Sequence, residues 1–362
     1  MNMNNKNWVS VWGNAVSIAE HHPEAYAKYI TLRYPVYIPF DGDTLRFTFD
    51  NYCGSEAVTV TRATVSAATS PVYEKMPLAC PCKKETICDI TFSKNESVTM
   101  EAHQTAVSDP VSFPVKKGMT LTVSLYFADF TLMQSAVLVT GPLSKGFFSL
   151  GDQTHADALP MDTTKTTNWF YFLSNIELMT AEENHTVICY GDSITAGAWP
   201  DYLTLLARQN PDNHTAFIRR ATSGSRVLRQ YECITYDSYG LKGTNRFPHE
   251  IPTTGADTVI IQQGINDIIH PIGIETNPFR PMSDLPTAKE LIDGYRYYIE
   301  EAKKLHLKVY MGTLLPIFGW RTYATFRDDL RNELNAWIRS AKEIDGCIDF
   351  DLALRGSENP SA

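Results

Sequence analysis

Polar and apolar residues alternate along short stretches in the first half of the chain. Short strand-like runs occur at residues 36–38, 44–49, 57–61, 97–100 and 119–127. A period of two predicts β-strands with one buried face. Only residues 15–30 allow a helix in this half, and Pro23 interrupts them. Many short strands and few helices predict a β-sandwich or jelly roll.

From about residue 185 the rhythm changes to strand-like runs separated by helical stretches. The strand-like runs are residues 186–190, 216–219, 258–261, 307–311 and 347–350. Apolar residues at helical spacing occur over residues 202–206, 287–306 and 326–342. Strands that alternate with helices predict a parallel sheet covered by helices on both faces, which is a three-layer α/β fold.

The two rhythms predict two domains. The length of 362 residues agrees with this, because domains usually contain about 100–200 residues. Residues 180–184 are polar, lack periodicity and are the expected linker. We therefore expect a β-rich accessory domain over residues 1–182 and an α/β domain over residues 183–362.

The composition is that of an ordinary soluble protein, with 43% hydrophobic and 20% charged residues. The net charge of −9 includes no block of like charges, which argues against nucleic acid or an anionic membrane as a partner. The polar first residues lack the apolar core of a signal peptide, and no apolar run approaches the ~20 residues of a membrane span. We expect a cytoplasmic protein.

The seven cysteines are expected to be reduced thiols, because an odd number spread over a long chain does not suggest a disulfide framework. Cys80, Cys82 and Cys88 form the only cluster. Their spacing departs from the usual zinc-ligand pair separated by two residues. No metal site is therefore expected.

The strongest candidate for chemistry is Ser193, in the segment GDSITAG of residues 191–197. The segment follows an apolar strand and precedes a helical stretch. A serine at such a turn exposes its hydroxyl, and its backbone N–H lies near a helix N-terminus. Both properties suit a nucleophile that also stabilises an oxyanion. The structural alternative is a serine that caps the helix.

Two later segments carry possible hydrogen-bond donors. Gly224 follows the predicted strand 216–219, and a glycine there lets the backbone approach a ligand closely and offer its N–H. Asn266 follows the predicted strand 258–261, and its side-chain amide offers two N–H donors. Each segment alone is also compatible with an ordinary turn.

The order and spacing of these segments resemble the first three sequence blocks of SGNH/GDSL serine hydrolases, over residues 187–362. The resemblance implies an SGNH (flavodoxin-like) α/β fold and a reaction that needs no cofactor. It implies that Ser193 is the nucleophile, and that the N–H groups of Ser193 and Gly224 form an oxyanion hole with the Asn266 side chain. Asp192 and Asp267 would hold their loops in shape. The first half resembles the β-rich N-terminal domain of some bacterial members.

The family's fourth block, Asp-x-x-His, has no counterpart in the expected place. Its His is the general base of such enzymes. No His follows His306, although residues 349–355 resemble the strand that precedes this block. Two segments fit the spacing elsewhere, namely Asp152 to His155 and Asp267 to His270. We expect His270 to line the cleft or to be exposed, and the 362-residue chain to be an impaired enzyme.

The resemblance implies an esterase that removes small acyl groups, acetyl foremost, from carbohydrates through an acyl-enzyme. Trp199, Trp320 and Tyr323 are candidates for stacking on sugar rings, although such aromatics are more often part of a core. A lipase or thioesterase is the alternative enzyme. A catalytically inactive sugar-binding or scaffold protein is the alternative outside enzymes. The expected partner is a small-molecule or oligosaccharide ester.

Overall fold

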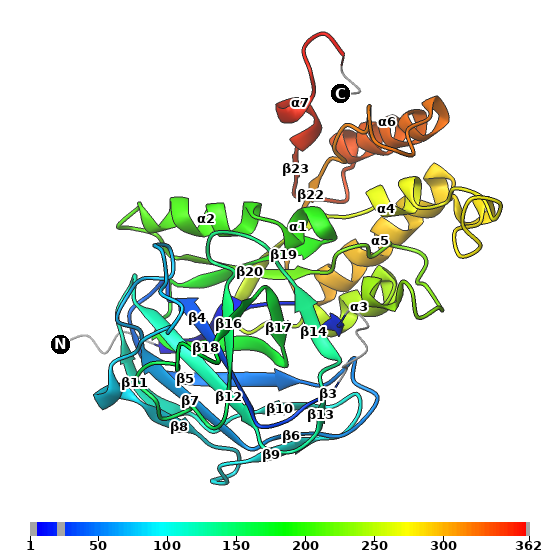
Figure 1. The fold of residues 1–362 in the computed structure, drawn as a ribbon. Helices are drawn as coiled ribbons and strands as arrows, with labels where there is room; N and C mark the ends of the chain where they lie inside the picture. Colours follow the sequence, from blue (N-terminus) through cyan, green and yellow to red (C-terminus); the bar gives the residue numbers. More distant parts are fainter. Residues whose placement is uncertain (1–5, 20–25, 360–362) are drawn as a thin grey trace. The chain divides into compact units, whose positions relative to one another are not determined.

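A computed structural model describes residues 6–19 and 26–359 (Figure 1). The backbone contacts divide the chain into two compact units. Unit 1 consists of Met1–Val187, Ala196–Arg220 and Thr254–Ala256, and unit 2 of Ile188–Thr195, Ala221–Thr253 and Asp257–Ala362.

Unit 1 contains two larger antiparallel sheets. One has the order β1 (Lys6–Gly13), β18 (Leu173–Ala181), β5 (Gly42–Asp50) and β10 (Thr105–Val107), with β11 (Val111–Val115) also paired to β5. The other has the order β16 (Lys165–Thr167), β15 (Gly146–Leu150), β4 (Ile30–Tyr37), β12 (Thr120–Phe127), β7 (Arg62–Ala67) and β8 (Cys88–Ile90).

Smaller pairings complete the strands of unit 1. They join β13 (Thr131–Leu132) to β3 (Tyr26–Ala27), β14 (Ser135–Leu138) to both β17 (Trp169–Tyr171) and β2 (Ser17–Ile18), and β6 (Val58–Val60) to β9 (Val98–Met100). One 3₁₀ turn, η1 (Lys84–Thr86), precedes β8.

Strand β12 lies at the centre of the second sheet, and all of its residues are buried. Val123 pairs with Tyr34 on one side and with Val65 on the other. The buried Arg33 next to this pair donates to the Ser124 hydroxyl at 2.9 Å and to backbone carbonyls at 2.7–3.2 Å. Its charge is thus solvated by the protein, as a buried guanidinium requires.

The strand predictions for the first half are confirmed, because the five predicted runs fall in β4, β5, β6, β9 and β12. The helix considered for residues 15–30 is wrong where the structure describes it. Ser17–Ile18 and Tyr26–Ala27 are strands, and Ile30 begins β4. Residues 20–25, with Pro23, lie outside the described residues. Here pairing with distant strands overrides a local helical pattern.

The second half of the chain forms a parallel five-stranded sheet, and this confirms the predicted fold class. Its order is β20 (Thr215–Ala221), β19 (His185–Gly191), β21 (Ala256–Gln262), β22 (Lys308–Gly312) and β23 (Gly346–Ile348). Its helices are α1 (Ser193–Ala196), α2 (Trp199–Arg208), α3 (Gly243–Glu250), α4 (Ile265–Ile269), α5 (Ala288–Lys304), α6 (Thr325–Ser340) and α7 (Phe350–Leu354). Two 3₁₀ turns, η2 (Asp237–Tyr239) and η3 (Met282–Asp284), lie in its loops.

Helix α5 shows how local sequence sets an element of unit 2. Thr287 and Glu290 form a capping box, in which the Thr287 hydroxyl accepts the Glu290 N–H and the Glu290 carboxylate accepts the Thr287 N–H. The apolar stripe of the helix, which includes Leu291, Tyr295 and Ile299, is buried. The predicted helices 287–306 and 326–342 are confirmed, because the bounds of α5 and α6 agree with them within a few residues.

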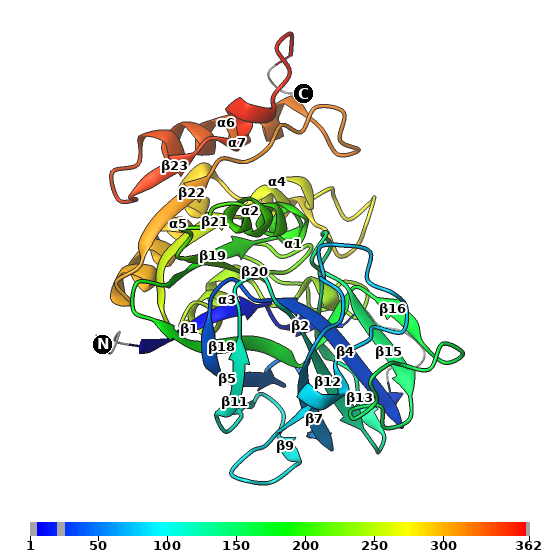
Figure 2. The same cartoon turned by 90° about the vertical axis from the view of Figure 1, so that its left-hand side faces the viewer.

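The predicted last strand, residues 347–350, is wrong at its end. Strand β23 stops at Ile348, and Phe350 begins α7 (Figure 2). The reason is Asp349, whose carboxylate accepts the Leu352 N–H at 3.0 Å and caps the helix. The stretch 349–355, which resembles a strand in the family pattern, is a capped helical turn here.

Candidate active site

Ser193 lies where strand β19 ends and helix α1 begins, and it is exposed. This confirms the predicted strand-to-helix turn. The helix cap is Asp192, whose carboxylate accepts the Ile194 N–H at 3.0 Å. The Ser193 hydroxyl makes no hydrogen bond to another described residue. The capping role considered for Ser193 therefore belongs to its neighbour.

A cavity of about 420 Å³ in unit 2 opens beside Ser193. All three predicted site residues, Ser193, Gly224 and Asn266, line it. The rest of the lining is Ile194, Ser223, Tyr239, Ile265, Ile269, His270, Arg280, Leu315, Pro316, Ile317, Trp320, Arg321 and Thr322. The walls are mainly apolar, with several polar side chains among them. Such a lining is typical of a pocket for a small organic ligand.

The backbone at Gly224 has the positive φ of 79°, which glycine adopts at little cost. A Cβ at this position would overlap the ring of Tyr239. Within the described part of the chain, neither the Gly224 N–H nor the Ser193 N–H has a hydrogen-bond acceptor. Two backbone donors at the cavity are thus available to a ligand.

Asn266 is buried, and its side-chain nitrogen donates to the Ser225 carbonyl at 3.0 Å. An amide nitrogen carries two hydrogens, so this bond orients the amide and leaves one N–H for the cavity. Together with the N–H groups of Ser193 and Gly224, it can stabilise negative charge on an oxygen atom.

Two buried carboxyl groups hold the site loops. Asp267 accepts the N–H groups of Val227 at 2.8 Å and Leu228 at 3.1 Å. Burial raises the pKa of Asp267 to about 6, and it raises the pKa of Asp192 to about 7. Both carboxyls bind backbone N–H groups of the site loops.

Two residues that the sequence did not mark as part of the site, Arg246 and Gln263, also hold these loops through hydrogen bonds. Arg246 of α3 is fully buried and donates to the Gly191 carbonyl at 2.9 Å and to the Thr222 hydroxyl at 2.7 Å. The side chain of Gln263 donates to the Ser225 hydroxyl at 2.9 Å and accepts from the Tyr298 hydroxyl at 2.7 Å. Gln263 lies three residues before Asn266 in the sequence, which is a weak signal, whereas nothing near Arg246 in the sequence marks it.

The two histidines considered as bases make other contacts. His155 lies 3.1 Å from Asp89 in unit 1. His270 lines the Ser193 cavity and is buried, and its Nδ1 lies 3.1 Å from the Tyr231 hydroxyl. Burial, reinforced by nearby arginines, lowers the pKa of His270 to about 3. Of the two outcomes expected for His270, lining the cleft is the one found. Among the described residues, no imidazole is hydrogen-bonded to Ser193.

Only one of the three candidate stacking aromatics lines the cavity. Trp320 does so, and 48% of its surface is exposed. Tyr323 packs edge-on against Phe318, with ring centroids 5.2 Å apart. Trp199 begins α2 and belongs to unit 1.

The cysteines of the described residues are all free, as expected. Within the same residues, no group of three or more His, Cys, Asp or Glu side chains could hold a metal ion. The described helices include none that is long and apolar enough to cross a membrane.

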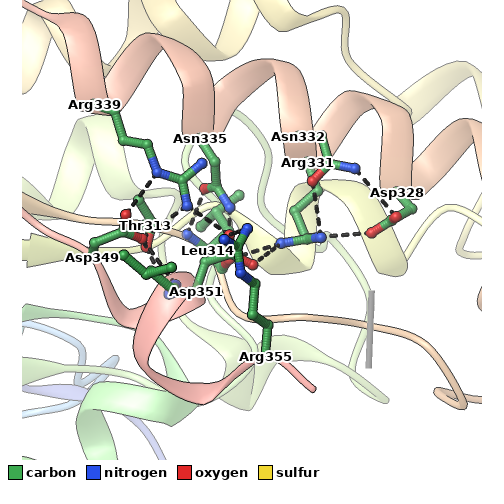
Figure 3. Close-up of polar contacts among 11 residues, drawn as sticks. Thr313, Leu314, Asp328, Arg331, Asn332, Asn335, Arg339, Asp349, Asp351 and Arg355 are labelled. Carbon is green, nitrogen blue, oxygen red and sulfur yellow. Dashed lines mark hydrogen bonds and ion pairs between the residues drawn. The ribbon is translucent and has the colours of Figure 1, made fainter. Parts of the chain in front are cut away.

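A network of charged residues ties α7 to α6 and to the end of β22 (Figure 3). We call it the α6–α7 network. The buried Arg331 lies between Asp328 at 2.8 Å and Asp351 at 2.6 Å. Arg339 contacts Asp351 at 2.6 Å and Asp349 at 2.8 Å. Arg339 also holds the pKa of Asp349 at about 2. Asp349 and Asp351 are thus bound by arginines of α6. Helix α7 lies beside α6 in both ribbon views (Figures 1 and 2).

The comparisons concern mainly the second half of the chain. Residues 189–362 match the model of the GDSL-like Lipase/Acylhydrolase family. A similar solved structure is that of a GDSL-like lipase from Bacteroides thetaiotaomicron VPI-5482, with 20% identity over 49% of this chain and 74% of that one, and a TM-score of 0.35. A second is a putative acylhydrolase from Bacteroides fragilis NCTC 9343, with 20% identity over 48% and 72% of the two chains and a TM-score of 0.33.

A third solved structure, a family two carbohydrate esterase from Cellvibrio japonicus, is 11% identical over 96% of this chain and 89% of that chain, with a TM-score of 0.33. No curated protein matches the sequence.

Proposed function

Because residues 189–362 form a domain of the GDSL-like lipase/acylhydrolase family, we propose that this protein is a serine esterase that removes small acyl groups, acetyl foremost, from carbohydrates. The observation that carries the proposal is the cavity at Ser193. An exposed serine hydroxyl there shares one space with the donors of Gly224 and Asn266. This combination suits acyl transfer.

In the proposed reaction the Ser193 hydroxyl oxygen attacks the ester carbonyl carbon and loses its proton to a base. The carbonyl oxygen becomes an oxyanion that accepts hydrogen bonds from the Ser193 and Gly224 N–H groups and from the Asn266 amide. The alcohol then departs with a proton and leaves an acyl-enzyme. Water hydrolyses the acyl-enzyme by the same steps and releases the carboxylic acid.

The choice of a small acyl group on a sugar rests on the cavity walls. Ile265, Leu315 and Ile317 offer apolar contact for an acyl methyl group, and the half-exposed Trp320 offers a ring face for a sugar. The volume of about 420 Å³ lies at the lower end of the usual range of about 300–1,000 Å³ for ligand pockets. A small ester fits these dimensions.

A lipase or thioesterase is the second candidate, and an exposed apolar side chain favours it. Phe318, which lies between the lining residues Ile317 and Trp320 in the sequence, is 53% exposed. Apolar surface of this kind would suit a longer acyl chain.

The experiment compares 4-nitrophenyl acetate, butyrate and octanoate with acetylated xylose and glucose. The proposal requires that Ser193→Ala abolish the enzymatic part of turnover and that acetate be the preferred acyl group. A preference for octanoate would favour the lipase. Sugar binding without Ser193-dependent turnover of any ester would favour the inactive sugar-binding protein.

For the cellular setting, we propose a cytoplasmic protein whose partners are small ester substrates. The free thiols of the described cysteines suit a reducing compartment. The net charge of −9 opposes binding to nucleic acid and anionic membranes. Fractionation of source cells with an antibody against the chain tests this location.

A further inference from the structure

The charges that line the Ser193 cavity all have one sign. Arg280 and Arg321 are among its lining residues, and no Asp or Glu is. The whole chain, by contrast, has a net charge of −9. The cavity is therefore an electropositive site in an acidic protein.

Arg280 is held in place before any ligand binds. Its carbonyl accepts the N–H groups of Ile272 and Gly273, both at 2.9 Å, and its own N–H donates to Asn277 at 3.0 Å. The guanidinium lies 4.4 Å from the ring centroid of Tyr236, a distance that favours cation–π attraction. Its position is thus fixed by backbone and ring contacts.

The guanidinium of Arg280 nevertheless has no counter-ion. Only 6% of the residue is exposed, yet its side chain makes no hydrogen bond or ion pair with any residue that the structure describes. Its Nε is buried without an acceptor. Asp284, four residues further on, is paired with Arg226 at 3.0 Å and lies 3.7 Å from Arg229.

Other buried arginines of unit 2 each have at least one acceptor within the protein for their guanidinium, although the Nε of Arg226, like that of Arg280, is buried without one. Arg226 has its carboxylate partner, Arg331 has two, and Arg327 donates to the carbonyls of Ile268 and Pro271. A buried charge without partners is costly. Arg280 lines an open cavity, so a ligand in that cavity can supply the missing acceptor oxygens.

We propose that the ester substrate carries a carboxylate group, which Arg280 binds inside the Ser193 cavity. The planar guanidinium can donate two parallel hydrogen bonds to a carboxylate. Arg321 is exposed and adds a second positive charge at the same cavity. The inference rests on the proposed esterase function and narrows it to acidic esters. The carboxylate belongs either to the sugar, as in a uronic acid, or to the acyl group, as in a half-ester of a dicarboxylic acid.

The neighbouring His270 fits this arrangement. It lines the same cavity, and the positive charge of Arg280 is the largest influence after burial in lowering its pKa to about 3. A neutral imidazole keeps one ring N–H, which can donate a hydrogen bond to an incoming anion.

The test has a binding arm and a kinetic arm, both with the full 362-residue chain. Calorimetric titration compares glucuronate and succinate with neutral glucose. Hydrolysis compares O-acetylglucuronate with O-acetylglucose for a charge on the sugar. It compares 4-nitrophenyl hemisuccinate with 4-nitrophenyl butyrate for a charge on the acyl group. We expect one charged member to bind more tightly and to have the higher kcat/KM.

The decisive variant is Arg280→Gln. A hydrogen bond to a charged group contributes roughly 1.5–3 kcal/mol, so the ratio of charged to neutral kcat/KM should fall about 10- to 100-fold. Arg280→Lys keeps the charge but loses the paired geometry and should give an intermediate ratio. Arg296→Gln, which removes an exposed positive charge from α5, is the control and should leave the ratio unchanged. Should Arg280→Gln fail to fold, Arg280→Lys provides the same comparison.

The outcomes separate the two proposals. Ser193-dependent hydrolysis with equal rates for charged and neutral esters would overturn the inference and leave the esterase. Arg280-dependent binding of glucuronate or succinate, without hydrolysis of any ester, would refute the esterase and keep the anion site. The absence of both the charge preference and anion binding would overturn the inference.

Discussion

At Gly224, the absence of a Cβ atom shapes the backbone of the candidate site. The sequence predicts a site role for Gly224 because a backbone donor needs close access to a ligand. The structure adds a packing reason, because a Cβ at this position would overlap the ring of Tyr239. The sequence could not supply this partner, because Tyr239 comes from the separate turn η2. Motif residues are thus predictable, while their packing partners depend on the folded chain.

Gly224→Ala should impair both folding and turnover. The alanine must adopt the φ of 79° and displace Tyr239. A positive φ costs about 1–2 kcal/mol and overpacking about 1–3 kcal/mol, so chemical denaturation should show a loss of about 2–5 kcal/mol. Gly319→Ala is the matched control, because φ is 80° there and a Cβ meets nothing within 4 Å. Equal losses in the two variants would contradict the role of Tyr239.

Asp192 should make stability depend on pH. Burial raises its pKa from 3.8 to about 7, so the folded chain holds this proton more tightly than the unfolded chain. Its contribution to stability is complete below pH ~4 and is lost as the pH rises to ~7, by up to about 1.4 kcal/mol per pH unit. Asp192→Asn keeps an oxygen for the helix cap and removes the titration.

Urea unfolding of both proteins at pH 4, 5.5 and 7 measures this effect. Relative to the wild type, the Asp192→Asn variant should gain stability as the pH rises. A constant difference between the two proteins across this range would show that Asp192 titrates normally.

Ser193 lacks a hydrogen-bonded base among the described residues, so turnover by the chain should be slow. Serine hydrolases without triad members retain only ~10³–10⁴ over water. Added imidazole can enter the open cavity and accept the Ser193 proton, so it should raise the rate of aryl acetate hydrolysis. Ser193→Ala corrects for direct hydrolysis by imidazole. Fast turnover without imidazole would mean that a base already reaches Ser193.

At the scale of elements, hydrophobic rhythm predicts the strands and the long helices because each spans several turns or alternations. The prediction fails at residue 349, where one capping aspartate converts the end of a predicted strand into helix α7. It also gives no sign of Arg246, whose partners lie in β19 and in the loop after β20. Contacts between distant segments cannot be inferred from local periodicity.

The α6–α7 network should be sensitive to the loss of one carboxylate. Asp351 is buried and contacts both Arg331 and Arg339 at 2.6 Å. Removing one partner from a buried ion pair typically costs about 3–5 kcal/mol, so Asp351→Asn should lower the free energy of unfolding by about that amount. Lys289→Gln, which breaks an exposed pair, should cost less than ~1 kcal/mol. Similar losses in both variants would show that the network contributes little.

At the scale of the whole molecule, we propose that the chain has two domains, residues 1–182 and 183–362. The proposal follows from the change of rhythm in the sequence. Folding can nevertheless couple them, because unit 1 contains residues from both sides of this boundary. The buried Arg220 donates to the carbonyls of Asn14 and Ser174, at 2.6 and 2.8 Å, and Thr186 donates to Ser10 at 2.7 Å.

A fragment of residues 183–362 should therefore not fold stably alone. It would lose the hydrogen bonds of Arg220 and Thr186 to residues 1–182, and it would expose to water the surface that these residues bury. Near-UV circular dichroism and urea unfolding of the purified fragment should show weak tertiary signal and low cooperativity. Co-expression with residues 1–182 should restore both. A cooperative transition in the isolated fragment would mean that the α/β domain is energetically independent.

The α6–α7 network also has a kinetic consequence for helix α7. Short helices usually fray, and their amide hydrogens exchange with solvent within local openings. Here the Asp351 N–H donates to the Thr313 hydroxyl, and the Asp351 carboxylate holds two arginines of α6. Opening α7 would leave those arginines without this carboxylate. The amides of this five-residue helix should therefore exchange as slowly as those of α6, so α7 should open only together with α6.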